Sequence, residues 1–375
     1  MVAADLPSVD VAIAGGGPIG GALALALSDS AVSVARIADE AEVADRPIAL
    51  SYGSRLILER LGAWDHGGTP IETIHVSQQG FGRTVIRTAD YGLPALGYVV
   101  SYSDVVARLG RRTAAVSGSL SGWETSGDEV VLGLDLDGRS ARMRARLLVL
   151  ADGGMARGAE RITDYRQRAV VAKVSAERAE PRTAWERFTT EGPLALLPFG
   201  DRHALVWSVA PGTADELCRL PESEFLARLH GAFGGRLGEF LSTGPRSAFP
   251  LSLRRNAIRP SPRVVAVGNA AQTLHPVAGQ GLNLGLRDAW ELARMLLDAP
   301  KEKMGTEAFL SGYARGRTMD RYAGIGFTDF LVRMFSNSVA PLSLARGAGL
   351  ALLDVVPPAR HFLARRMIFG ARALP

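Results

Sequence analysis

Two glycine-rich stretches contain the residues best suited to hold a ligand. In the first, three glycines with the spacing G-x-G-x-x-G lie between an apolar stretch, Val9–Ala14, and a run of Ala and Leu; they are Gly15, Gly17 and Gly20. In a strand–turn–helix unit the first glycine makes the turn, the second lets a pyrophosphate approach, and the third allows the helix to pack closely on the strand. The sequence therefore predicts dinucleotide binding here, with an ordinary turn between a strand and a helix as the alternative.

The second stretch runs from Arg263 to Leu297. It predicts a buried strand over Val264–Val267, then a glycine-punctuated loop, then a helix whose apolar residues recur at helical spacing. The glycines of the loop are Gly268, Gly279 and Gly281. Without a Cβ their backbone can approach a flat ligand closely, while the unpaired N–H groups that open the helix favour an electron-rich partner. Whether both stretches serve one ligand depends on the fold.

Three charged residues after predicted strands are candidates for ligand contacts. The strand expected over Val32–Ile37 should end in a carboxylate that bonds the ribose of a nucleotide, and we choose Asp39, with a helix cap as the alternative. Arg46 either pairs with a phosphate or lies at the surface. Asp152 follows a buried strand, Leu147–Ala151, on the side where such sheets bind ligands, or it caps a loop.

The elements that would position these residues follow from local signals. Helices are expected over Ser54–Leu61 and Asp104–Arg112, and a hairpin over Glu129–Leu150 with a turn at Asp137-Gly138. On the return strand of the hairpin three arginines are expected to form a solvated face: Arg142, Arg144 and Arg146. Further β structure is expected over Ile71–Arg87, Tyr165–Val174, Ala184–Thr189, Leu194–Pro198 and Ala204–Val209, and a helix or two over Glu222–Leu241. These signals predict a nucleotide-binding domain interrupted by a mostly β domain.

Composition narrows the classes of function. The 375 residues are 47% hydrophobic and carry a formal net charge of +5, which suits a globular protein with an anionic ligand or an acidic membrane surface nearby. No basic run is interleaved with aromatic residues, so nucleic acid is not an expected partner. Cys218 is the only cysteine, which excludes a disulfide framework, a thiolate zinc site and a dithiol redox centre within one chain. No apolar run reaches the roughly 20 residues of a membrane span. The first ten residues lack a secretory signal, so a cytoplasmic location is expected.

Five longer stretches point to a family. They read DVAIAGGGPIGGALALAL, RPIALSYGSRLILERLGAWD, DYRQRAVVAKV, AWERFTTEGPLALLPFGDRHALVW and GNAAQTLHPVAGQGLNLGLRDAWELARML. With them the chain resembles the FAD-dependent aromatic hydroxylases of the para-hydroxybenzoate hydroxylase type, and among these the ubiquinone-biosynthesis hydroxylases. The resemblance implies an α/β fold with a Rossmann-type FAD-binding domain, an inserted mostly β substrate domain and a helical C-terminal region. The expected bounds are 1–75, 98–165 and 255–325 for the FAD-binding domain, 76–97 and 166–254 for the substrate domain, and 326–375 for the C-terminal region.

The resemblance also implies roles for individual residues. Arg46 would contact FAD, Asp152 would take part in binding FAD and the nicotinamide cofactor, and Gly268 with Asn269 would lie at the ribityl chain. The pyrophosphate would be held by Gly15, Gly17 and Gly20. The isoalloxazine ring would lie beside Pro276, Gly279, Gln280, Gly281, Leu282 and Asn283. His275 is the candidate for a catalytic polar group near the reacting centre, with a structural histidine as the alternative.

Several positions depart from the family pattern. Ala38 occupies the expected place of the ribose carboxylate, and Asn269 stands where Asp is commonest. Met155-Ala156 and Ser101-Tyr102-Ser103 also differ from the expected polar residues. Asn269 can still accept a ribityl hydrogen bond through its amide oxygen. These departures bear most directly on how firmly FAD is retained.

The implied reaction is hydroxylation of a polyprenylated phenol. NADH or NADPH would reduce FAD, O₂ would add to give a C4a-hydroperoxyflavin, and its distal oxygen would attack the ring. Two alternatives stay open. One is a non-catalytic or weakly FAD-binding member of a ubiquinone-biosynthesis complex, and the other is a flavin-dependent isoprenoid reductase or epoxidase on the same scaffold.

The C-terminal region indicates where the protein would encounter its substrate. From Arg315 onwards there are nine Arg and three Asp, with apolar blocks over Phe327–Phe335, Leu342–Leu353 and Phe362–Ile368. Such a basic amphipathic surface suits peripheral contact with the inner face of a membrane, where a polyprenyl tail resides. A helical lid or a contact within a homo-oligomer is the alternative.

Overall fold

The first sheet is parallel except for an antiparallel hairpin, and its parallel part carries both glycine loops at one edge. The computed structural model describes residues 4–39, 44–65, 67–111, 113, 115–153, 161–178, 180–255, 262–273, 280–318 and 340–370. The parallel strands are β1 (Ala4–Asp5), β2 (Val9–Ala14), β3 (Val34–Ala38), β9 (Ala115–Ser117), β12 (Arg139–Leu150) and β19 (Val264–Ala266). β12 pairs with both β2 and β19, so these three strands end at the same edge of the sheet. The predicted Rossmann-type arrangement is confirmed.

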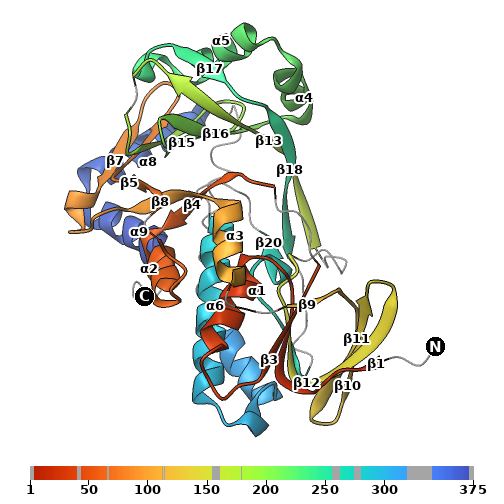
Figure 1. Cartoon of the computed structure of the whole chain (residues 1–375). Coiled ribbons are helices and arrows are strands. Elements are labelled where there is room, and N and C mark those ends of the chain that lie inside the picture. The colour runs from red at the N-terminus through yellow and green to blue at the C-terminus, as the bar shows by residue number, and fades with distance from the viewer. Residues whose placement is uncertain are drawn as a thin grey trace.

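Alternation along β2 divides the core between the two faces of this sheet. Val11 and Ile13 pack in the cluster that contains α1 (Pro18–Leu27) and α6 (Gln280–Asp298). Ala12 and Ala14 pack instead with β10 (Ser119–Ser126) and β11 (Glu129–Leu136). In Figure 1, α1, α3 (Tyr102–Arg111) and α6 lie side by side. The first helix begins at Pro18, directly after the glycine of its N-cap.

The predicted hairpin is confirmed as β11 and β12. Its turn is Asp137 (φ 53°) and Gly138 (φ 82°), both in the left-handed region that a two-residue hairpin turn requires. Arg142 and Arg144 are exposed, as a solvated face demands. Arg146 differs, because it is half-buried and pairs with Asp10.

The second sheet is mostly antiparallel. Its strand order is β20 (Gln272–Thr273), β18 (Ser247–Arg255), β13 (Arg161–Ala176), β16 (Arg202–Val209), β15 (Pro193–Phe199), β14 (Thr183–Phe188), β6 (Thr73–Gln78) and β7 (Arg83–Arg87), with β17 (Phe240–Thr243) paired to β13. α4 (Pro211–Arg219) and α5 (Glu222–Phe233) cover one face, at the top of Figure 1. The sequence did not predict α4. Over Glu222–Leu241, where a helix or two were expected, the structure has α5 and a 3₁₀ turn, η2 (Gly235–Leu237).

A small sheet and the C-terminal helices join the two layers. The small sheet has the order β4 (Pro47–Ser51), β8 (Gly97–Ser101), β5 (Thr69–Ile71) and was not predicted. The remaining elements are α2 (Tyr52–Arg60), α8 (Ala340–Val355), α9 (Pro357–Phe369) and the 3₁₀ turns η1 (Thr88–Asp90), η2 (Gly235–Leu237), η3 (Gly268–Ala270) and η5 (Lys301–Lys303). Within the described residues, no helix is long and apolar enough to cross a membrane. The proposed domain bounds stay a prediction.

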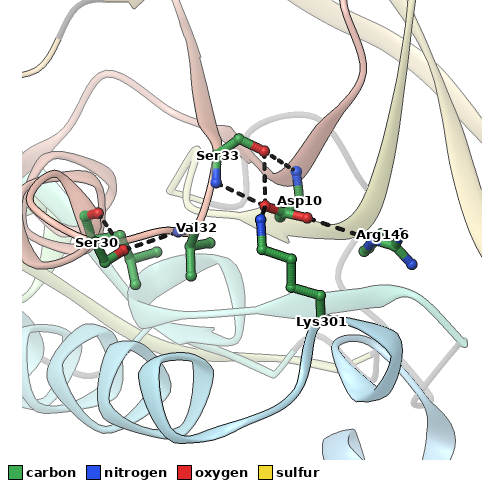
Figure 2. A network of polar contacts seen from close by, with 7 residues as sticks. Asp10, Ser30, Val32, Ser33, Arg146 and Lys301 are labelled. Carbon is green, nitrogen blue, oxygen red and sulfur yellow. Dashed lines mark hydrogen bonds and ion pairs between the residues drawn. The ribbon is translucent and has the colours of Figure 1, made fainter.

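A buried carboxylate ties together the far edge of the parallel sheet (Figure 2). Asp10, only 6% exposed, accepts hydrogen bonds from the backbone and hydroxyl of Ser33 at 2.8 Å and from Lys301 Nζ at 2.6 Å. Arg146 Nε lies 3.5 Å from its other oxygen. These partners are the residue directly before β3, the first residue of η5 and a residue of β12, so one side chain joins three segments around the start of β2.

Candidate functional site

The three glycines of the first loop have different surroundings. A Cβ on Gly15 would lie 2.4 Å from the Ala151 carbonyl oxygen, and one on Gly20 would lie 2.5 Å from the Gly15 carbonyl oxygen. A Cβ on Gly17 would meet no described atom within 4 Å. Packing therefore requires the first and third glycines, whereas the second faces open space, as its predicted role at a pyrophosphate demands.

The helix after this loop begins without a side-chain cap. Gly17 is the N-cap residue of α1, Pro18 follows, and no side chain bonds to the first turn. The N–H groups of an uncapped first turn, with the positive end of the helix dipole, form a site for an anion. Open space and an anion site therefore coincide at Gly17.

The second glycine loop packs directly against the first helix. Gly268 has φ 59°, and a Cβ there would lie 3.1 Å from Ile19 Cγ1 of α1. Gly285 of α6 approaches the same side chain, since its Cβ would lie 2.7 Å from Ile19 Cδ1 and 3.2 Å from the Gly268 Cα. Both loops thus adjoin one another at one edge of the parallel sheet and can serve a single ligand.

The polar candidates cluster at that edge. Asp39 is exposed directly after β3, and a Cβ on Gly16 would lie 3.7 Å from its carbonyl oxygen. Asp152 is half-buried after β12. Asn269 is exposed, and its Oδ1 lies 3.7 Å from where a Cβ of Gly281 would be. The structure therefore brings the ribose candidate, the carboxylate after β12 and the start of α6 to one side of the sheet.

Arg46 stacks on an aromatic ring in this structure. Its Cζ lies 4.4 Å from the centroid of the Tyr102 ring, and its side chain is exposed. The neighbouring Asp45 accepts hydrogen bonds from Ser101 Oγ at 2.6 Å and Ser103 Oγ at 3.0 Å. The bond from Ser101, followed by that from Ser103, outweighs burial and holds the pKa of Asp45 below its usual value. The Ser101-Tyr102-Ser103 departure thus anchors the segment that carries Arg46.

Asn283 uses its amide to hold the small sheet. It is 2% exposed, accepts from the Ser51 N–H at 2.8 Å and donates to the Ala49 carbonyl at 3.1 Å. Leu282 is half-buried against the α1–α6 core, and Gly281 is half-buried. Gln280 opens α6, and its neighbours His275, Pro276 and Gly279 lie outside the described residues. The ring-side roles of this group stay predictions.

One buried ion pair was missed by the sequence reasoning. Asp288 of α6, 0% exposed, accepts from the Gly268 N–H at 3.1 Å and from Arg317 Nε at 2.7 Å. Arg317 is 3% exposed. Asp288 lies four residues after the buried Leu284 and four before the buried Leu292. A carboxylate on such an apolar stripe was the signal that could have identified it.

The fold and the site together define a dinucleotide-binding protein of the Rossmann type, and the residues present fit FAD. A family model described as "FAD binding domain" matches residues 121–321, more than half of the chain. The chain is 35% identical to "Ubiquinone hydroxylase UbiL" of Rhodospirillum rubrum, covering 95% of this chain and 88% of that protein. It is 32% identical to "3-demethoxyubiquinol 3-hydroxylase" of Escherichia coli, covering 91% and 93%.

A solved structure shares the fold over nearly the full length. The p-nitrophenol 4-monooxygenase PnpA of Pseudomonas putida has a TM-score of 0.76 at 18% identity, covering 98% of this chain and 99% of that one. The chain belongs to the FAD-dependent hydroxylase family of ubiquinone biosynthesis, as the resemblance in its sequence predicted. It is accordingly a flavin-dependent aromatic hydroxylase with FAD as its cofactor.

Proposed function

We propose that the protein hydroxylates the aromatic ring of a polyprenylated phenol in ubiquinone biosynthesis, using NADH or NADPH and O₂. The observation that carries this proposal is the junction of the two glycine loops, where Gly268 packs on Ile19 beside the Gly15–Gly20 turn. FAD, when bound, supplies the redox and oxygen chemistry. The chain binds the cofactor, orients the ring and keeps water away.

Different residues at the junction would hold different parts of FAD. Gly17 and the uncapped start of α1 would hold the pyrophosphate, and Asp39 would bond the adenosine ribose. Asn269 and the start of α6 would lie towards the flavin ring, where helix N–H groups stabilise negative charge. Asp152 and Arg46 remain candidates for further cofactor contacts.

The apolar residues on one face of the second sheet favour an apolar aromatic substrate. On its face away from α4 and α5, strands β6, β15 and β16 present apolar side chains that are only partly buried. They are Val76, Ala195, Leu197 and Val206. Partly exposed apolar side chains on neighbouring strands form a wall suited to a prenylated ring.

Turnover by the purified, FAD-loaded protein tests this function. We expect 2-prenylphenol to stimulate NAD(P)H oxidation and to yield a ring-hydroxylated product. Protein that never takes up FAD would favour the scaffold alternative, and a product altered only in its prenyl chain would favour the reductase or epoxidase. Gly17→Val serves as a control that should fold but bind FAD more weakly.

We further propose that the turn between α8 and α9 contacts an anionic membrane. Leu352 and Val355 in the last turn of α8 and Phe362 in α9 are 61%, 77% and 63% exposed, and Arg365 of α9 is exposed as well. Asp354 lies 3.7 Å from Arg360, which offsets its charge. Apolar side chains with cations around them suit the boundary between headgroups and acyl chains.

Vesicle flotation tests the membrane contact. The protein should float with phosphatidylcholine vesicles that contain phosphatidylglycerol, and less with phosphatidylcholine alone. Phe362→Ser should weaken flotation, whereas Leu241→Ser, 61% exposed on β17, should not. Equal loss in both variants would contradict a specific contact at this turn. Association with a ubiquinone-biosynthesis complex or with a second copy of the chain stays a prediction.

A further inference from the structure

A carboxyl group without a described partner lies in the middle of β14. Its two neighbours on the strand face the helices: Trp185 packs in the α4–α5 core, and Arg187 Nε donates to the Ala232 carbonyl of α5 at 3.1 Å. Because side chains alternate along a strand, Glu186 points to the opposite face. Its cross-strand partners on β6 and β15 are Val76 and Ala195, two residues of the apolar wall.

That face is turned towards the cofactor end of the molecule. Ala184, two residues before Glu186, packs with Ile71 and Val99 of the small sheet. The small sheet is in turn held to the start of α6 by Asn283. α4 and α5 lie on the other face, far from α1 and α6 (Figure 1). Glu186 therefore projects from the side of the second sheet that is linked to the second glycine loop.

The direct cross-strand partners of Glu186 are apolar. On the same face Phe188 packs with Leu350 of α8, and two buried polar residues, Gln78 opposite Phe188 and Thr84 opposite Val76, lie further along. Two cations on this face are Arg202 of β16, two strands from β14, and Lys173 of β13, three strands away, whose Nζ lies 4.8 Å from the Phe199 ring centroid. No described residue hydrogen-bonds or ion-pairs with Glu186. Glu186 is half-buried as a residue, and burial raises the pKa of its carboxyl to about 7.

A carboxyl group without a partner in such a wall destabilises the fold, so a structural role does not explain why Glu186 is there. It is also a suitable base: general bases are most effective when their pKa lies near the working pH. Glu186 is a half-buried residue and not a fully enclosed one, so a bound ring can approach its side chain.

We propose that Glu186 is a catalytic residue that accepts the hydrogen bond and then the proton of the substrate's phenol hydroxyl. This rests on the proposed function. The O–H bond breaks, the proton passes to the carboxylate, and the electron pair stays on the phenol oxygen, from which it enriches the ring for attack on the oxygen that the family's reaction delivers. When the ring regains aromaticity, the attacked carbon releases its own proton to water, the phenol oxygen takes a proton back from Glu186, and the carboxylate is restored.

Glu186→Gln in the FAD-loaded protein tests this role, with Glu180→Gln as a matched control because Glu180 is exposed in the loop before β14. The control should behave as the unmodified protein. With 2-prenylphenol, Glu186→Gln should keep its FAD, lower kcat by about 100-fold and leave KM within about threefold, because a general base contributes ~10²–10⁴-fold to rate. Without the base, reduced cofactor should be consumed without product. The unmodified protein should speed up as pH rises through about 7, and Glu186→Gln should lack that limb.

A binding measurement separates this proposal from the proposed function. Without NAD(P)H, the unmodified protein should bind 2-prenylphenol more tightly at pH 8 than at pH 6, because the carboxyl accepts the phenol hydrogen bond more strongly when it is ionised, and Glu186→Gln should bind it equally at both pH values. Equal affinity at both pH values in the unmodified protein overturns the role of Glu186 even if Glu186→Gln fails to fold. So does unchanged kcat in the variant. Absence of hydroxylated product from the unmodified protein overturns the proposed function instead, while the affinities at the two pH values still decide on Glu186.

Discussion

At the scale of single residues, two positions of the first glycine loop require glycine for different reasons. The Ala151 carbonyl leaves no room for a Cβ on Gly15, whose φ of 148° also disfavours other residues. Gly17 has φ −74°, which any residue can adopt, and open space around it. The first therefore serves the fold and the second serves the ligand.

Substitution should separate these two needs. Gly15→Ala should lower the free energy of unfolding of the apo-protein by about 2–3 kcal/mol through overpacking and backbone strain. Gly17→Val should cost less than about 1 kcal/mol, as a lost N-cap preference does, and should weaken FAD binding at least about tenfold. Urea denaturation and FAD fluorescence titration measure the two effects. FAD binding by Gly17→Val that equals wild type would contradict this division.

The lowered pKa of Asp10 makes the free energy of unfolding depend on pH. Burial alone would raise its pKa, but the hydrogen bond from Lys301 and those from Ser33 outweigh burial, so the pKa lies below the usual 3.8. A folded-state pKa below the unfolded value stabilises the protein above about pH 4, and this contribution is lost as pH falls further. Asp10→Asn should therefore cost about 2–3 kcal/mol at pH 7, because it leaves buried donors with a weaker acceptor.

At pH 3 the difference in free energy of unfolding between Asp10→Asn and the wild type should become smaller. Urea denaturation at both pH values measures it. Glu124→Gln, an exposed change on β10, should behave as wild type at both. A gap that stays constant with pH would show that the carboxylate charge is not what matters.

At the scale of elements, α6 carries the anchor of the second glycine loop. Asp288 joins α6 to the Gly268 N–H and to Arg317, so the helix and the loop move as one unit. Asp288→Asn should cost about 3 kcal/mol, since it leaves the buried Arg317 without its counter-charge, and it should also weaken FAD binding. Thermal unfolding with and without FAD measures both. Asp298→Asn, exposed at the end of the same helix, should change neither.

The elements also show which signals a sequence carries. The strand–turn–helix unit and the Asp137-Gly138 hairpin were predictable, because glycine spacing and alternation are local. The small sheet was not, since β4 and β8 pair across about fifty residues and Asn283 reaches them from the other end of the chain. The role of Glu186 was hidden for the same reason: only the pairing of β14 with β6 and β15 reveals its apolar surroundings.

At the scale of the whole molecule, two sheets meet through the small sheet, with the cofactor loops on one side and an apolar wall on the other. This arrangement suits a reaction in which a flavin and a hydrophobic ring must lie together away from water. The family of the chain could be predicted from sequence, because its motifs are long. The way the wall faces the loops required the structure.

The most direct test of this account is turnover of 2-prenylphenol by FAD-loaded protein under ¹⁸O₂ with NAD(P)H, followed by mass spectrometry of the product. The account predicts one ¹⁸O atom on the aromatic ring, in an amount that depends on bound FAD. An unlabelled ring, or label found only in the prenyl chain, would contradict it.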